Sequence, residues 1–322
     1  MHVSLDSALG RQRRLNQVGE TITSIAAPVA AYSLRSLSGG DPLAVRVRRD
    51  TGGGAGDDDE QDFTVSEINT GALTAFVGSG NDGFVTKWYD QSGNNRDLIQ
   101  SATGEQPSIV ESGTFLNGVK SNKASSNDTM QNLQVSTDGV NANFGTDDWA
   151  TGASSKLGLI YVGTVPHSLI FKTDSDAVIW GGGRAVSSYQ SGGLSLQVIK
   201  AGNDSWKLSN ERQGLSPARI IEALQTSAQN TDNDVVWYGI ADNRDFTVSV
   251  NGAVETDTEA ADLDTRENVA LSLFGSYAGD SSRYYQRSGG GVCKECYLYA
   301  GTNITSIPTI ATKINEHYSI YS

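Results

Sequence analysis

The chain has 322 residues, enough for one large β-sandwich or for two smaller domains. Hydrophobic residues make up 37% of it, and 36 glycines against 2 methionines favour many short strands and turns over packed helices. The excess of 37 acidic over 24 basic residues gives a net charge of −13, which disfavours nucleic acid as a partner because phosphates are repelled. No apolar run approaches the roughly 18 residues that a membrane span needs, and the first residues do not resemble a signal peptide. We therefore expect no nucleic-acid partner and no membrane contact.

Residues 1–27 differ from the rest and are predicted to form an N-terminal arm, followed by one domain over residues 28–322. The arm has a net charge of +1, which leaves the remainder at −14. It combines apolar and basic side chains that would contact another chain, and the alternative is a mobile tail. The side chains assigned to this anchor are Leu5, Leu9, Arg11, Arg13 and Arg14.

The first strand predicted in the domain lies near residues 43–48. Leu43, Val45 and Val47 alternate with Arg46 and Arg48, a pattern that predicts a half-buried strand with a basic outer face.

A short helix is predicted next, over residues 71–77. Asn69 or Thr70 would cap its start, and Gly78 would end it.

Residues 83–89 predict a strand that ends abruptly in a tight turn. Strict alternation would place Trp88 on one face of this strand and Val85 on the other. Short polar side chains and a glycine follow, and these residues favour a compact turn because they bond to the local backbone or accept a positive φ. The predicted structural turn consists of Asp90, Gln91, Ser92, Gly93 and Asn94.

The run Trp88-Tyr89-Asp90-Gln91-Ser92-Gly93-Asn94 resembles the YDQSG signature of α-L-arabinofuranosidase B-type catalytic domains. It is even more similar to a set of phage virion proteins that carry this signature in a concanavalin A-like, laminin G-like sandwich. The likeness covers about residues 28–120, through the segments 31–35, 44–49, 72–78 and 106–110. The resemblance implies a sandwich fold and a virion role.

From about residue 105 to 300 the chain reads as short strands separated by turns, clearest at 157–164, 168–173 and 194–200. Asn251-Gly252 between two alternating runs predicts a hairpin with a type I′ turn. Near the end, apolar residues at helical spacing predict a helix within residues 304–320 that closes over one edge of a sheet.

Cys293 and Cys296 are predicted to be two structural free thiols, because no further ligands accompany them for zinc. On a regular strand this spacing would send the two thiols to opposite faces. No metal site and no cofactor are predicted. The acidic run at residues 57–60 is interpreted as solvated charge, with calcium binding through its carboxylate oxygens as the alternative.

A catalytic role has two weak candidates in the sequence. Glu255, Asp257 and Glu259 share one face if extended and resemble the catalytic strand of laminarinase-type glucanases, but threonines replace the aliphatic residues between them. The arabinofuranosidase family has a nucleophilic glutamate beside a Cys-Cys pair, and residues 150–200 contain neither. No catalytic residue is therefore assigned. Trp180 is the ring on which a sugar would stack, with a sheet-packing tryptophan as the alternative.

The sequence therefore predicts an all-β fold: a concanavalin A-like antiparallel β-sandwich (jelly roll) with a short N-terminal arm and a C-terminal helix. We interpret the chain as a bacteriophage virion structural protein, a head fibre, capsid decoration or tail or adhesin component on the virion surface. Its expected partners are other virion proteins through the arm, with a homo-oligomer and a host surface glycan also compatible. The alternatives are a glycan-binding module and a glycoside hydrolase of arabinofuranosidase or glucanase type.

Overall fold

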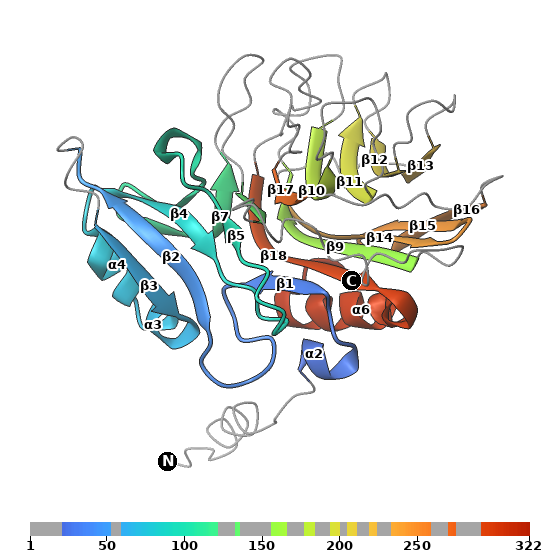
Figure 1. The fold of residues 1–322 in the computed structure, drawn as a ribbon, viewed down its shortest axis with the longest axis horizontal. Coiled ribbons are helices and arrows are strands. Elements are labelled where there is room, and N and C mark those ends of the chain that lie inside the picture. The colour runs from blue at the N-terminus through green and yellow to red at the C-terminus, as the bar shows by residue number, and fades with distance from the viewer. Residues whose placement is uncertain are drawn as a thin grey trace, which may run out of the picture.

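The structure, a computed structural model, is an antiparallel β-sandwich with a helix against the outer face of one layer (Figure 1). This confirms the predicted all-β sandwich and its C-terminal helix. The structure describes residues 21–52, 59–121, 133–135, 156–165, 177–183, 194–199, 205–210, 219–223, 233–258, 270–274 and 291–322. The predicted strand at 168–173 lies outside these residues.

The strands form two hydrogen-bonded series that both include β4 (Asp82–Trp88). The first series runs in spatial order through β3 (Glu60–Thr64), β2 (Leu43–Asp50), β4, β6 (Ser108–Glu111), β7 (Thr114–Ser121), β18 (Gly291–Ala300), β9 (Lys156–Thr164), β14 (Asp234–Asp242), β15 (Asp245–Val250) and β16 (Ala253–Thr258). β1 (Ala30–Ser33) pairs with β18 beyond the end of β7.

The second series runs from β4 through β5 (Leu98–Ile99), β8 (Leu133–Val135), β17 (Ala270–Leu273), β10 (Ala177–Gly183), β11 (Leu194–Ile199), β12 (Ser205–Asn210) and β13 (Arg219–Ala223). Figure 1 shows β10 to β13 lying over β9, β14, β15 and β16, which makes these two groups the facing layers of the sandwich.

The described helices lie between strands or at the two ends of the described body. They are α2 (Ile22–Ile25), α3 (Val65–Asn69), α4 (Ala72–Val77), α6 (Ile307–Tyr318) and the 3-10 helices η1 (Thr103–Glu105) and η3 (Gly301–Ser306). The helix predicted over residues 71–77 is α4, which begins after Gly71 rather than after Asn69 or Thr70. The sequence analysis did not anticipate α3, although its capping box of Thr64 and Glu67 is a recognisable start signal.

The alternation expected for β2 and β4 is interrupted by β-bulges. In β4 the register shifts between Val85 and Lys87, so that Val85 and Trp88 both enter the core instead of facing opposite sides. In β2 a shift after Leu43 leaves that side chain 41% exposed. Arg48 is also buried, where its Nε donates to Gln106, so the predicted basic outer face does not extend to it.

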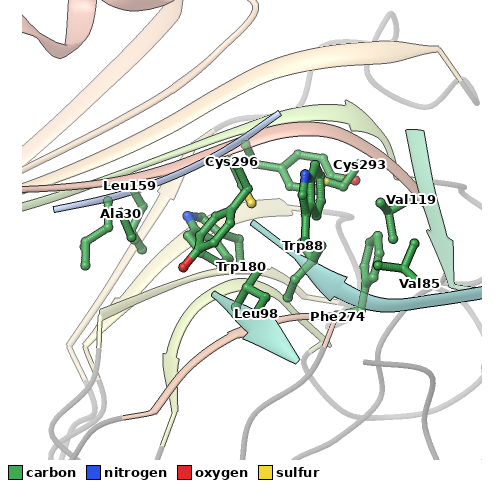
Figure 2. Close-up of a cluster of buried hydrophobic side chains, with 14 of the residues drawn as sticks. Ala30, Val85, Trp88, Leu98, Val119, Leu159, Trp180, Phe274, Cys293 and Cys296 are labelled. Atoms are coloured by element: carbon green, nitrogen blue, oxygen red, sulfur yellow. The ribbon is translucent and has the colours of Figure 1, made fainter. Parts of the chain in front are cut away.

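The same effect corrects the prediction for the two cysteines. The pairing of β18 with β9 shifts between Cys293 and Glu295, which adds one residue to β18. Cys293 and Cys296 therefore lie in the same buried cluster rather than on opposite faces, as Figure 2 shows. Both are free thiols.

Two hydrophobic clusters hold the described residues together. The larger one fills the space between the layers and includes Trp88, Trp180, Trp237 and Phe274. The smaller one lies on the outer face of β9, β14 and β18, where it is covered by α6 and α2.

The C-terminal helix forms where its sequence pattern predicted, but it covers the outer face of β9, β14 and β18 rather than a sheet edge. The predicted apolar positions Ile307, Ile310, Ala311 and Ile314 are buried, and Pro308 lies in the first turn. No helix among the described residues is long and apolar enough to cross a membrane.

The body of the molecule begins earlier than the predicted boundary at residue 27. Ile22 in α2 is 4% exposed and belongs with Ala26 to the cluster beneath α6. The backbone N–H of Thr23 also donates to the carbonyl of Leu37. Residues 21–27 are thus part of the folded body.

The predicted hairpin forms at Asn251-Gly252. Val250 pairs with Ala253, so the connection has two residues, and both have positive φ (50° and 82°). The side-chain oxygen of Asn251 also accepts from the backbone N–H of Val236, which ties the turn to β14. Here a short sequence signal determined the geometry.

Candidate functional site

The most extensive polar constellation among the described residues is the turn after β4. Asp90 accepts four hydrogen bonds: Oδ1 from the backbone N–H groups of Ala31 and Ser92 (both 2.9 Å), Oδ2 from the Ser92 hydroxyl (2.6 Å) and the Arg96 N–H (3.0 Å). Both carboxylate oxygens are therefore occupied by bonds that shape the turn and hold β1.

The Gln91 side chain continues these hydrogen bonds to the backbone at the end of β1 and just after it. Its side-chain nitrogen donates to the carbonyls of Ser33 (2.9 Å) and Arg35 (3.1 Å), and its side-chain oxygen accepts from the N–H of Leu37 (3.0 Å). The amide is 7% exposed, so its polar atoms are satisfied by protein rather than water.

Asn94 and Arg96 hold the residues that precede β1. The Asn94 amide donates to the carbonyls of Pro28 (3.3 Å) and Val29 (3.0 Å), and the Arg96 guanidinium donates to Val29 (2.9 Å). We call the side chains of Asp90, Gln91, Ser92, Asn94 and Arg96 the clasp. The clasp binds the backbone of residues 28–37 and leaves Asp90 no unshared oxygen for chemistry.

Trp180 lies in the core between the layers. Figure 2 shows it among the buried hydrophobic side chains, and it is 0% exposed. Its indole N–H donates to the carbonyl of Tyr297 (2.9 Å), and Tyr32 packs edge-on against the ring at 5.8 Å. The ring therefore has no free face on which a sugar could stack, and this corrects the role assigned to Trp180 from sequence. It has the alternative role of a sheet-packing tryptophan.

A buried carboxylate that the sequence analysis did not single out lies on the other side of β18. Glu295 is 0% exposed and accepts bidentate hydrogen bonds from the guanidinium of Arg35, at Nε and at Nη2 (3.1 Å). The hydroxyls of Ser33 (3.1 Å), Tyr297 and Tyr318 (2.8 Å) also donate to it. This network joins the loop after β1, β18 and the end of α6.

Burial and the charge of Glu295 together shift the pKa values of its neighbours. Burial disfavours the charged form of Arg35, but the interactions with Glu295 outweigh it and raise the pKa of the guanidinium. Burial, reinforced by the Glu295 charge, raises the pKa of Tyr297 and Tyr318 well above the usual value. The two tyrosines therefore keep their hydroxyl protons to a higher pH than a free tyrosine does, and Arg35 and Glu295 form an ion pair within this network.

Unlike Glu295, the described carboxylates considered for hydrolysis are exposed to solvent. Glu255 and Asp257 are on β16, whose six residues are all exposed, and Glu259 lies outside the described residues. A glycosidase acid needs a raised pKa from a partly apolar site beside a second carboxylate. Among the described residues, no group of three or more His, Cys, Asp or Glu side chains could hold a metal ion.

The arm residues Leu5, Leu9, Arg11, Arg13 and Arg14 lie outside the described residues. The sequence analysis missed the buried ion pair of Glu295, because an acidic residue two positions from Tyr297 in a strand gives no sign that an arginine 260 positions away will pair with it.

Comparison with known proteins identifies the fold. No family model matches the sequence, and no curated protein matches it either. A mutant family 54 glycoside hydrolase, an α-L-arabinofuranosidase soaked with 4-nitrophenyl α-L-arabinofuranoside, aligns with 88% of this chain at 13% identity and a TM-score of 0.55. An arabinofuranosidase complexed with arabinofuranosyl-α-1,2-xylobiose aligns at 14% identity with a TM-score of 0.53.

The chain spans 62% of the length of these arabinofuranosidases. Tailspike protein 2 of Escherichia coli O157:H7 bacteriophage CAB120 aligns with 59% of this chain at a TM-score of 0.36, too low to support an argument. At these identities the likeness shows the fold alone: this chain shares the β-sandwich of the arabinofuranosidases.

Proposed function

We propose that this chain is a bacteriophage virion structural protein, a head fibre, capsid decoration or tail or adhesin component, that displays a lectin-like sandwich at the virion surface. The observation that supports it best is the clasp. Its residues resemble a signature of phage virion proteins, and polar atoms of Asp90, Gln91 and Asn94 are bonded to the backbone of residues 28–37. The signature thus contributes rigidity rather than catalysis.

In this proposal the segment before residue 21 attaches the protein to the particle through other virion proteins. Support comes from its charge, since it contains Arg11, Arg13 and Arg14 while residues 28–322 carry −14. The docking of Ile22 beneath α6 supports it too, because it gives the segment a fixed starting point on the body.

The test is a deletion of residues 1–20, which leaves Ile22 and the described body intact. We expect the truncated protein to fold normally by circular dichroism but to be lost from purified particles when it replaces the full chain in an infection. The control replaces Arg11, Arg13 and Arg14 by lysine, which keeps the charge and should preserve incorporation. Unchanged incorporation of the truncated protein would reject the anchor.

A glycan-directed function is the second candidate, favoured by the fold shared with arabinofuranosidases over 88% of this chain. It predicts binding to, or hydrolysis of, arabinan, β-glucan or a host surface glycan. A glycan array with the purified chain would detect binding, and release of reducing sugar that Glu255→Gln abolishes would indicate a hydrolase. No binding and no release would remove this candidate.

A further inference from the structure

Among the described residues, β16 is the last strand of its layer, and it pairs on one side only, with β15. Its six residues pair with β15 in unbroken register, from Val250 opposite Ala253 to Asp245 opposite Thr258. Among the described residues no strand pairs with its other side, and all six residues are exposed, Val254 at 50%. Half of its backbone N–H and C=O groups therefore point away from the sheet, in the arrangement that accepts an added strand.

This edge carries one feature that protects natural edge strands, a pair of acidic side chains, and lacks the others. It contains no proline, no lysine and no bulge, and Val254, Thr256 and Thr258 favour extended structure. Its charges are Glu255 and Asp257, two residues apart and therefore on the same face. A second β16 strand would bring like charges together, which is destabilising, so the edge favours a basic partner strand.

The chain itself contains a segment with the matching pattern. Arg11 and Arg13 are also two residues apart, so in an extended conformation they project to one side with the same spacing of about 6.5 Å as Glu255 and Asp257. Arg14 adds a third positive charge. Six residues separate Arg14 from the start of the described body at residue 21, a reach of about 20 Å when extended.

We propose that residues 9–14 of one copy add as an extra strand to the free edge of β16 in a second copy. Every copy carries both the basic segment and the acidic edge, so the contact is heterologous and links copies into a ring or an open row. The acidic bodies otherwise repel one another, which restricts association to this contact. The inference rests on the proposed docking role of the arm and names its acceptor.

Site-directed cross-linking tests the contact directly. Arg13→Cys and Asp257→Cys are made in separately tagged chains, mixed, and oxidised with oxidised glutathione; Cys293 and Cys296 are buried and remain as internal controls. We expect a disulfide-linked heterodimer on a non-reducing gel. The matched control pairs Arg13→Cys with Glu316→Cys on the exposed face of α6, and it should give no dimer.

Charge reversal provides the second readout. Arg11→Glu with Arg13→Glu, or Glu255→Arg with Asp257→Arg, should each weaken self-association of the full chain about tenfold in sedimentation experiments, because two cross-strand pairs are lost. Combining all four substitutions in one chain should restore it.

Three outcomes would overturn the inference. The full chain could be monomeric, or the gel could show no more disulfide-linked heterodimer than the Glu316→Cys control gives. The third is a disulfide that forms only within a chain carrying both Arg13→Cys and Asp257→Cys. If the full chain is monomeric while deletion of residues 1–20 still prevents incorporation into particles, the acceptor is another virion protein. That result would reject this inference and leave the proposed function standing. If the deletion leaves incorporation unchanged while cross-linking succeeds, the proposed anchor fails instead.

Discussion

Asp90 is the residue on which the turn after β4 depends most. A carboxylate can accept at both oxygens, and all four groups that face Asp90 are donors. An amide of the same size would point its own N–H₂ group at two of these donors.

We therefore expect Asp90→Asn to lower the free energy of unfolding by about 3 kcal/mol, since hydrogen bonds to a charged acceptor are lost and donors are left unpaired. Urea unfolding followed by tryptophan fluorescence measures the change. Asp59→Asn is the control, because Asp59 is 69% exposed and its ion pair with Arg49 contributes less than about 1 kcal/mol. Equal effects of the two substitutions would contradict the role of the clasp.

Glu295 shows the same dependence in a buried ion pair. Glu295→Gln would leave the Arg35 guanidinium without its counter-charge, and removing one partner of a buried pair costs about 3 kcal/mol or more.

Replacing both residues, by Arg35→Met and Glu295→Leu, should destabilise less than the sum of the single substitutions, because no uncompensated charge remains. Thermal unfolding of the four proteins in the cycle measures this coupling. Strictly additive losses would show that the pair does not act as a unit.

At the scale of elements, the close pairing of β9 with β18 depends on a residue without a side chain, Gly163. A Cβ on Gly163 would lie 1.9 Å from the carbonyl oxygen of Val292, and its φ of +150° suits glycine. Gly118 on β7 and Gly291 on β18 are similarly crowded. At these three positions the neighbouring strands lie so close together that the residue must be glycine.

Gly163→Ala should accordingly cost about 3 kcal/mol, from backbone strain together with displacement of β18. The measurement is the midpoint of chemical denaturation. Gly104→Ala is the matched control, because nothing lies within 4 Å of a Cβ there, and it should change stability by less than about 0.5 kcal/mol. A tolerated Gly163→Ala would mean that β18 is not held closely against β9.

At the scale of the whole molecule, the buried tyrosines set the alkaline limit of stability. Burial raises the pKa of Tyr32, Tyr161 and Tyr297 well above the value near 10 of an unfolded chain, and burial with a hydrogen bond to Asp62 raises that of Tyr89 to about 12. Above pH 10 the unfolded chain releases protons that the folded chain retains. Stability is therefore fully present below pH 10 and is lost as pH rises.

We expect cooperative unfolding between about pH 10 and pH 12, with the absorbance of tyrosinate rising together with the loss of circular dichroism. Titration of every tyrosine near pH 10 in a protein that keeps its circular dichroism would contradict this. The experiment also reports on both clusters, because Tyr161 and Tyr297 belong to different ones.

Local signals in the sequence predicted those parts of the fold that depend on short segments. Asn251-Gly252 predicted its hairpin because only certain residues accept positive φ at both central positions, and the spacing of Ile307, Ile310 and Ile314 predicted the buried face of α6. The turn at residues 90–94 was predicted as structure, but its partner segment, residues 28–37, was not.

By itself, then, the sequence determined the fold class, the turns and the C-terminal helix, because these follow from backbone preferences and local periodicity. Only the tertiary structure decided that Cys293 and Cys296 share a face, that Trp180 is buried and that Arg35 neutralises Glu295. A bulge adds a single residue without altering composition, and an ion pair across 260 positions depends on how the first and last strands meet. Pairing between distant segments is set by packing of the whole chain, and no short pattern records it.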